Sequence, residues 1–490
     1  MIQKPNIKIN LPGGLVSPAH LTTLLEIAQK CAVDTVHFGA RQQLLFFVHP
    51  REMELFKNKM SAQDLEFDTD MEFNPNVMST YAFADLFQTT SENWMSEGKY
   101  LDIFNDLDFV SPLKINISDG TQSYAPFFTG HLNFISSDVP HFWFCYIRYP
   151  KTHAIDRFHS LIYTNDLGKF IQRTLDVGRW TLENPNLEFL TSKVQRSLPQ
   201  LNTEGIILRE IFTDLEIPRF VMPYYEGFNT LESGKLWLGI YRRKDDFPLN
   251  FLIELCRLCE ETRIGNIGVS NWRSLVIKGI EKTDRIKWEK LLSKYGINVR
   301  HAANELNWQT EDDSPEGAAL KQYLVKKLGE KDVRTFGLAF AIKMRHKSEV
   351  FGSVIIRREP MFRFGKFEPS FFGFLDSFDV FYAQDFNPHT RKRKTFRLGI
   401  PKSRLPEEIM KLSKKYYNEL TAVKTENPFA KKVSKNKITE SKVYRCKDCW
   451  TVFDEKTEGS SFENINADYV CPICESEKNT FESVTNDNLV

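Results

Sequence analysis

The stretch that decides the fold is residues 7–48, IKINLPGGLVSPAHLTTLLEIAQKCAVDTVHFGARQQLLFFV. Apolar and polar residues alternate over 7–11, which is typical of a strand, and Pro-Gly-Gly then turns the chain. Ser17 followed by Pro18 predicts the start of a helix, and apolar residues recur on one face of that helix. Two further strands are predicted, at 35–38 and 44–48. The stretch therefore predicts the order strand, helix, strand, strand.

The same order returns about 230 residues further along the chain. It is predicted as a strand, a helix and two strands, at 236–241, 248–261, 267–269 and 274–277. A repeat of this length is unlike a solenoid and indicates two homologous halves that face each other about a pseudo-twofold axis. Each half also contains two more strands and a helix, predicted at 112–118, 130–136 and 166–175 and again at 335–342, 350–356 and 317–327. The predicted fold class is α+β, with duplicated halves in mixed α/β layers.

Composition narrows the class of protein. The chain has 490 residues, too many for one core, and a formal net charge of +1. This balance argues against binding to nucleic acid or to a membrane surface. We see neither a signal peptide nor an apolar run long enough to span a bilayer. Four of the eight cysteines, namely Cys31, Cys145, Cys256 and Cys259, have apolar neighbours, as expected of reduced core thiols in a cytoplasmic protein.

The other four cysteines form two Cys-x-x-Cys pairs near the C-terminal end, Cys446/Cys449 and Cys471/Cys474. The short spacing places both sulfurs of a pair on one tight backbone turn, and two such turns can close a tetrahedron around one metal ion. Tetrahedral sulfur sites select iron or zinc. The sequence therefore predicts a metal site at these four cysteines. A redox disulfide is disfavoured because the chain has no secretory signal.

The residues around these pairs resemble rubredoxin, a family that holds one iron on four cysteines and transfers single electrons. The resemblance spans residues 444–482 and includes the aromatic positions that pack a small core. Such a module buries too little apolar surface to fold alone, so the metal serves as its staple. The matching segments are YRCKDC at 444–449, FD at 453–454, FENINADYVCPIC at 462–474 and FE at 481–482.

The choice between iron and zinc depends on the residues that follow the cysteine pairs. Rubredoxins usually carry glycine there, where this chain has Trp450 and Glu475. Glycine lets the backbone adopt a positive φ and aim N–H groups at the sulfurs, which tunes the potential of an iron site. Tyr469 and Asn466 also stand where the family usually has tryptophan and proline. The prediction is one iron ion on four cysteines, with structural zinc as the alternative.

A second resemblance covers roughly residues 5–422 and is to the sirohaem-containing nitrite and sulfite reductases. It is carried by the two-half plan and by four short motifs, namely Leu11-Pro12-Gly13-Gly14, Arg41-Gln42, Lys114 and Trp272-Arg273-Ser274-Leu275. That family uses two ferredoxin-like halves and two cofactor-binding layers. It holds a four-iron cluster bridged to a sirohaem, and its basic side chains grip haem carboxylates and the substrate anion.

The resemblance implies a binding role for three cationic residues, and two other cationic residues of the family are replaced in this chain. Arg41 matches an anion ligand of the family, and Lys114 matches the first of two lysines in a Lys-x-Lys strand. The second lysine is replaced by Asn116, and another family arginine is replaced by Pro75. Arg41, Lys114 and Arg273 are therefore the candidates for holding an anion or a tetrapyrrole.

The cysteines of the four-iron cluster are missing. They would fall near Asn304 and between Gly337 and Gly352, where the sequence has none. A four-iron cluster without thiolates is not expected, so sirohaem is disfavoured as well. Reduction of nitrite or sulfite by the family's mechanism is not expected, and no catalytic residue is assigned.

The sequence thus favours an electron carrier over a stand-alone reductase. Its expected partners are redox proteins, among them a nitrite or sulfite reductase, and its alternatives are a zinc-stabilised assembly or regulatory protein and a cluster-free, sirohaem-binding oxidoreductase. The expected segments are a first ferredoxin-like half (1–110), a first cofactor-layer domain (111–230), a second ferredoxin-like half (231–300), a second cofactor-layer domain (301–422), a Lys-rich linker (423–442) and a rubredoxin-like domain (443–490).

Overall fold

The computed structural model describes residues 4–71, 73–86, 94–107, 109–148, 155–178, 201–220, 222, 224–302, 304–345, 350–360, 376–390, 392–425, 442–448, 451–455, 461–466, 469–471 and 476–484. The chain divides into two compact units, Met1–Asn418 and Glu419–Val490.

Two small sheets in the first unit repeat one topology. In each sheet a strand, a helix and two strands follow one another, and the last strand pairs antiparallel with the other two. The first copy is β1 (Ile7–Ile9), α1 (Pro18–Lys30), β3 (Thr35–Phe38) and β4 (Leu44–Phe46). The second copy is β13 (Leu236–Ile240), α6 (Leu249–Glu261), β15 (Ile267–Val269) and β16 (Leu275–Ile280). The duplication predicted from the sequence is confirmed in this layer.

The two copies exchange short strands. β2 (Leu15–Val16), which precedes α1, pairs with β15 of the second copy. β14 (Phe247–Pro248), which precedes α6, pairs with β3 of the first copy. Because the exchange is reciprocal, each sheet is completed by the other half, as a pseudo-twofold relation requires. β12 (Gly227–Thr230) extends the second sheet beyond β13.

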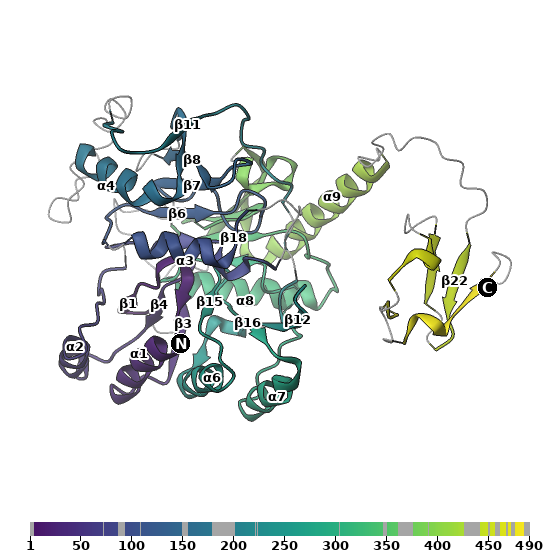
Figure 1. Cartoon of the computed structure of the whole chain (residues 1–490), viewed down its shortest axis with the longest axis horizontal. Helices are drawn as coiled ribbons and strands as arrows, with labels where there is room; N and C mark the ends of the chain where they lie inside the picture. Colours follow the sequence, from purple (N-terminus) through teal and green to yellow (C-terminus); the bar gives the residue numbers. More distant parts are fainter. Residues whose placement is uncertain are drawn as a thin grey trace. The chain divides into compact units, whose positions relative to one another are not determined.

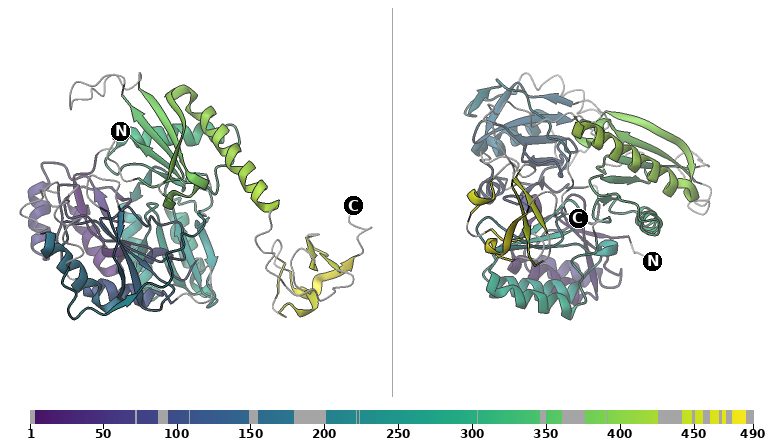
Figure 2. Two further views of the ribbon diagram at one scale, coloured as in Figure 1. Left: turned by 90° about the horizontal axis from the view of Figure 1, so that it is seen from above. Right: turned by 90° about the vertical axis from the view of Figure 1, so that its right-hand side faces the viewer.

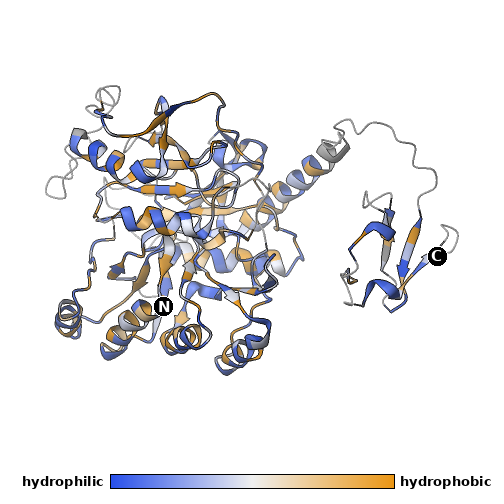
Figure 3. Ribbon diagram, in the orientation of Figure 1, coloured by the Kyte–Doolittle hydropathy of each residue, from blue (hydrophilic) through white to orange (hydrophobic). Residues whose placement is uncertain are grey.

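Four helices cover these two sheets. They lie in a row in the order α2 (Met53–Ser61), α1, α6 and α7 (Arg285–Lys294) (Figure 1). Hydrophilic and hydrophobic residues alternate along these helices (Figure 3), and hydrophobic residues of α1 and α6 are buried in a core that the two halves share. α1 begins where Ser17 accepts a hydrogen bond from the N–H of His20, the cap predicted from the sequence.

Two larger sheets also repeat one pattern. Along β5-β6-β7-β8-β10 and along β17-β18-β19-β20-β21, the first two pairings are parallel and the next two are antiparallel. β11 and β9 extend the first of these sheets. The first sheet contains β5 (Met78–Ser79), β6 (Ile115–Ser118), β7 (Leu132–Ser136), β8 (Phe142–Arg148), β9 (Ile155–Arg157), β10 (Ser160–Tyr163) and β11 (Leu208–Glu210). The second contains β17 (Trp308–Gln309), β18 (Phe340–Lys343), β19 (Val354–Glu359), β20 (Ser377–Ala383) and β21 (Arg393–Pro401).

Each larger sheet has its own helices and its own core. α3 (Glu97–Asp106) and α4 (Leu167–Gly178) pack on the first sheet, and α8 (Pro315–Gly329) and α9 (Leu405–Thr425) pack on the second. Figure 2 shows α9 running along the strands of its sheet. The first unit therefore has two layers of paired halves, and the small sheets and the large sheets are each duplicated.

The second unit is a small antiparallel sheet in the order β23-β22-β24. Its strands are β22 (Val443–Cys446), β23 (Val452–Asp454) and β24 (Phe481–Val484). The core consists of aromatic residues, as predicted, and contains Tyr444, Phe453 and Phe462 with Ile465, Tyr469 and Phe481 packed against them.

Element boundaries differ modestly from those predicted. The strands predicted at 112–118 and 335–342 begin later, at Ile115 and Phe340, because the chain bends at 112–113 and turns at 336–337. α9 extends into the predicted linker as far as Thr425, and residues 426–441 lie outside the described residues. No described helix is both long and apolar enough to cross a membrane.

Candidate functional site

The first candidate site is the pair of cysteine turns in the second unit. Cys446 is the last residue of β22, and Cys471 begins the other pair; both side chains are buried. The N–H of Cys446 donates to the carbonyl of Thr451 at 2.9 Å, and the N–H of Cys471 donates to the carbonyl of Ser476 at 2.8 Å. Each bond spans five residues from the first cysteine of a pair. The two turns therefore have equivalent backbone hydrogen bonds, as two matched metal-binding turns would.

A side-chain hydrogen bond joins the two turns. Asp448, inside the first pair, accepts from the hydroxyl of Ser476 at 2.6 Å, just after the second pair. The N–H of Lys447 donates to the carbonyl of Thr480 at 3.2 Å, which holds the first turn against the start of β24. Segments 25 or more residues apart in the sequence thus lie next to each other.

Two of the four cysteines predicted to hold the metal, Cys446 and Cys471, belong to the described residues. Cys449 and Cys474 lie outside the described residues, and no group of three or more potential metal ligands occurs among the residues that are described. The described residues are compatible with a four-thiolate metal site in three respects. Two buried thiols lie in equivalent turns, a hydrogen bond joins these turns, and aromatic residues form the core of the unit. Four thiolates here would hold one iron or zinc ion.

The second candidate site is a cavity of about 170 Å³ where the two halves of the first unit meet. Arg41, Gln43 and Lys114 of the first half line it, and Arg41 and Lys114 are two of the three cations predicted to hold an anion or a tetrapyrrole. The second half contributes charged residues that the sequence analysis did not assign to a site, namely Glu311, Asp312, Asp313 and Arg345. Cations and carboxylates therefore line this cavity together.

Arg41 is held by protein oxygens. Its guanidinium donates to the carbonyl of Asn76 at 2.8 Å, to the carbonyl of Ile115 at 3.0 Å and to the side-chain oxygen of Asn116 at 3.3 Å. Asn116 stands where the reductases carry a second lysine, and a lysine there would place a like charge beside Arg41. The asparagine instead supplies an acceptor for the arginine.

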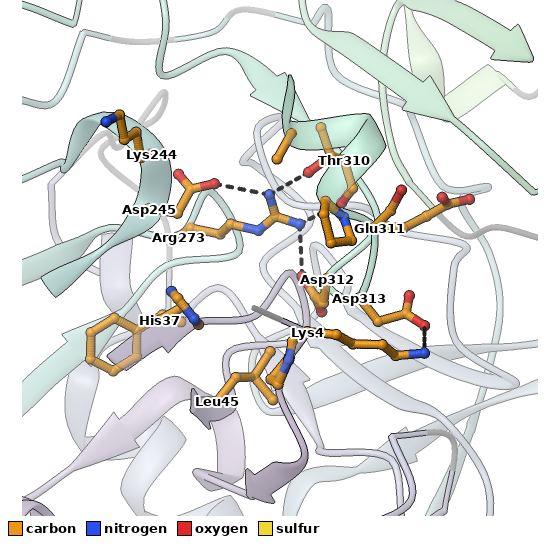
Figure 4. A pocket seen from close by; sticks show the side chains of 15 residues that line it. Lys4, His37, Leu45, Lys244, Asp245, Arg273, Thr310, Glu311, Asp312 and Asp313 are labelled. Atoms are coloured by element: carbon orange, nitrogen blue, oxygen red, sulfur yellow. Dashed lines mark hydrogen bonds and ion pairs between the residues drawn. The ribbon is translucent and has the colours of Figure 1, made fainter. Parts of the chain in front are cut away.

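Arg273 lies apart from this cavity, in a neighbouring pocket, and is paired on two sides (Figure 4). It is buried, and its terminal nitrogens lie 3.2 Å from Asp245 and 2.7 Å from Asp312. Lys321 is also buried and lies 3.4 Å from Asp245. Asp312 in turn accepts from the N–H of Ala40 at 2.9 Å, directly before Arg41. This carboxylate therefore joins the two halves.

The charges of this cluster balance. Burial alone would raise the pKa of Asp245, but Lys321 and Arg273 together hold it below its ordinary value. Burial would likewise lower the pKa of Arg273, and Asp312 and Asp245 raise it instead. Two cations and two carboxylates make the cluster neutral, so Arg273 already has its counter-ions without a bound anion.

The size of the cavity argues against a bound sirohaem. The volume of about 170 Å³ is well below the roughly 300–1,000 Å³ of pockets for drug-sized ligands. Carboxylates of Glu311, Asp312 and Asp313 lie among the cations of this cavity, so the lining is not uniformly basic, as a site for the carboxylates of the macrocycle would be. The sequence has no cysteine between Cys259 and Cys446, so neither cluster ligands nor a bridging thiolate can come from the second of the larger sheets.

The sequence analysis did not assign Asp312, Asp245 or Lys321 to a site. Charged residues in a polar run such as Glu311-Asp312-Asp313 are usually solvated, and Ser314 and Pro315 after them predict only a helix start. Asp312 and its partner Ala40 are 272 residues apart. The duplicated plan is a weak signal for such a contact, since it predicts only that the halves meet.

Comparisons with known proteins support the scaffold. Residues 6–60 match the model of the nitrite/sulfite reductase ferredoxin-like half domain. Among solved structures, the NirA protein of Mycobacterium tuberculosis has a similar fold, with a TM-score of 0.62 and 15% sequence identity over 84% of this chain and 81% of that chain. No curated protein matches the sequence. The first unit therefore has a nitrite/sulfite reductase-like scaffold, and at this identity the likeness shows the fold alone.

Proposed function

We propose that this protein is an electron-transfer protein that holds one iron ion on Cys446, Cys449, Cys471 and Cys474. An iron ion on four thiolates alternates between the ferric and ferrous states and so accepts or donates one electron at a time. The reductase-like scaffold to which it is attached has lost the cysteines of the family's own cluster. The thiolate site near the C-terminal end is then the redox centre of the chain.

The observation that carries this proposal is the equivalence of the two cysteine turns. Cys446 and Cys471 are both buried, and each makes the same backbone hydrogen bond to the residue five positions later. The bond between Asp448 and Ser476 brings the turns together. A disulfide within one pair would not need a second turn of matching geometry, whereas a four-thiolate site does.

The test is metal analysis and visible spectroscopy of the full chain purified in air. We expect one iron per chain, a red ferric-thiolate spectrum, reversible bleaching with dithionite, and loss of both metal and colour in Cys446→Ser and Cys471→Ser. Cys145→Ala is the matched control, because this buried thiol lies in the core of the first unit. A chain that binds iron but cannot be reduced and reoxidised would contradict the proposal.

Zinc is the second candidate, and the feature that favours it is Trp450 and Glu475 in place of the usual glycines. A side chain at these positions disfavours the positive-φ backbone conformation that aims N–H groups at the sulfurs. A structural zinc ion depends less on those hydrogen bonds than a redox-active iron ion does. The same metal analysis separates the two. One zinc per chain after growth in iron-rich medium would make the unit a structural module of an assembly or regulatory protein.

The partner we propose for the iron form is a redox enzyme, and a nitrite or sulfite reductase is the first to test, because the scaffold shares their ferredoxin-like half domain. The prereduced full chain should reoxidise in a stopped-flow mixture with such a reductase and its substrate. Cys446→Ser supplies the control for electrons that bypass the metal. Reoxidation no faster than in buffer would exclude these enzymes as acceptors.

A further inference from the structure

A third pocket, separate from both candidate sites, lies beside the sheet of the second ferredoxin-like half. It has a volume of about 340 Å³ and is lined by Arg242, Arg243, Gly296, Asn298 and His301. None of these residues lines the cavity at Arg41 or the pocket at Arg273. The lining comes from the residues that follow β13 and from the chain that leaves α7. No carboxylate is among these described lining residues.

A buried carboxylate fixes the orientation of His301. The side chain of Glu226, just before β12, is fully buried, and one of its oxygens accepts from the N–H groups of His301 at 2.9 Å and Ala302 at 2.8 Å. The hydroxyl of Tyr224 donates to the same oxygen at 3.0 Å. Burial and Glu226 raise the pKa of Tyr224 to about 12, so this hydroxyl keeps its proton at neutral pH. Three donors thus hold the carboxylate in place.

The other oxygen of Glu226 lies 2.9 Å from Nδ1 of His301. That edge of the imidazole therefore faces the protein, and Nε2 is the ring nitrogen left for the pocket that His301 lines. With a proton on Nε2, this nitrogen is a hydrogen-bond donor.

Two more donors line the same pocket. Arg242 is half-buried and uses Nε to donate to the carbonyl of Asp246 at 3.3 Å, while no hydrogen bond among the described residues engages its terminal nitrogens. The side-chain oxygen of Asn298 accepts from the N–H of Arg300 at 2.9 Å, which leaves the amide NH₂ of Asn298 to donate. Arg243 is already neutralised by Glu305, 2.8 Å away.

We propose that this pocket binds a phosphate group, held by the terminal nitrogens of Arg242, by Nε2 of His301 and by the amide of Asn298. Three donors from two segments of the chain line one pocket, and the planar fork of arginine matches an oxyanion with several acceptor oxygens. The phosphate is either the free ion or the terminal group of a small phosphate ester. Glu226 is a positioning residue, because it acts on the ligand through His301. The proposal is independent of the metal at the cysteine turns.

The test is calorimetric titration of the metal-loaded full chain with inorganic phosphate and with phenyl phosphate, at constant ionic strength. Arg242→Gln and His301→Gln should each weaken binding at least tenfold, and Arg242→Lys should weaken it less than Arg242→Gln. Arg257→Gln removes an exposed arginine of α6 and should bind like the wild type. Tighter binding of phenyl phosphate than of inorganic phosphate would identify an ester as the ligand class, and equal binding would identify the free ion.

Glu226→Gln needs a readout that a purely structural role would not change. The ¹⁵N chemical shifts of the His301 ring report which nitrogen carries the proton, and phosphate should shift the Nε2 signal in the wild type. In Glu226→Gln we expect weaker phosphate binding and a changed protonation pattern at an unchanged unfolding temperature. The proposal is overturned if Arg242→Gln binds phosphate like the wild type, if Arg41→Gln in the other cavity abolishes binding instead, or if no variant and no wild-type protein binds phosphate at millimolar concentrations.

Discussion

Replacing Asp312 with asparagine tests whether a carboxylate of the protein itself joins the two halves. Asp312 accepts from the N–H of Ala40 at 2.9 Å and lies 2.7 Å from Arg273. Asparagine keeps an oxygen for Ala40 but removes a charge, so Arg273, Lys321 and Asp245 are left with a net charge of +1. Breaking a buried ion pair on one side costs about 3–5 kcal/mol. We expect about 3 kcal/mol, because asparagine retains one hydrogen bond.

Thermal unfolding followed by circular dichroism measures the loss. The first unit ends at Asn418, and an unfolding entropy of about 2.1 cal/mol/K per residue gives roughly 0.9 kcal/mol per degree. A loss of about 3 kcal/mol therefore lowers the unfolding temperature by roughly 3 °C.

The adjacent residue supplies a matched control. Asp313 pairs with Lys4 and Arg345, whose side chains are 62% and 55% exposed. Such pairs contribute about 0–1 kcal/mol, so Asp313→Asn should lower the unfolding temperature by about 1 °C or less. Adding Arg273→Met to Asp312→Asn leaves Lys321 and Asp245 as a balanced pair and should recover part of the loss. Equal decreases in unfolding temperature for Asp312→Asn and Asp313→Asn would refute the conclusion that the carboxylate of Asp312 joins the two halves.

Three further predictions concern other parts of the chain. Burial lowers the pKa of His389 to about 4, so between pH 6.5 and 4 the unfolded chain binds more protons than the folded chain. The free energy of unfolding therefore falls as the pH drops through this window, by up to about 3 kcal/mol. Unfolding curves of His389→Gln should lack this loss. Cys446→Ser, or removal of metal with a chelator, should abolish the structure of the second unit in hydrogen exchange and leave the unfolding temperature of the first unchanged. A Cβ on Gly239 would lie 1.6 Å from the carbonyl of Tyr225, so Gly239→Ala should cost at least about 2 kcal/mol in denaturant unfolding. Gly329→Ala is the control and should not destabilise, because a Cβ there would meet no atom within 4 Å beyond its chain neighbours and its own helix backbone.

The sequence predicts what is encoded locally. The strand-helix-strand-strand order of residues 7–48 follows from periodicities of two and of 3.6 residues, so its recurrence after 236 is visible without a structure. The exchanged strands β2 and β14 escape prediction because each has two residues, too few for any periodicity, and because each pairs with a strand more than 200 positions away. The cysteine pairs can be predicted for the same reason as the helices, since their geometry depends on spacing within one turn.

The candidate site in the first unit was predicted only in part, because the sequence gives residue types and not their partners. Arg41 and Lys114 do line one cavity, but Arg273 lies in the neighbouring pocket. A resemblance to an anion-binding family predicts the cations and is silent on whether an external anion or the chain's own carboxylates neutralise them. That choice depends on contacts such as the one between Asp312 and Ala40, which exist only in the folded chain.

The paired state of these cations has a consequence for the whole protein. In a scaffold whose arginines are neutralised only by the carboxylates of a cofactor, positive charges stay buried and unpaired until the cofactor binds. Folding of such a scaffold depends on the cofactor. Here Asp312 and Asp245 neutralise Arg273, and backbone carbonyls with Asn116 hold Arg41. Arg41 and Arg273 therefore have protein partners without a bound anion, and the stability of the first unit should not change when sirohaem is added. The metal dependence of the chain is then confined to the second unit, so the two units should unfold independently, and only the transition of the second should move with added iron or zinc.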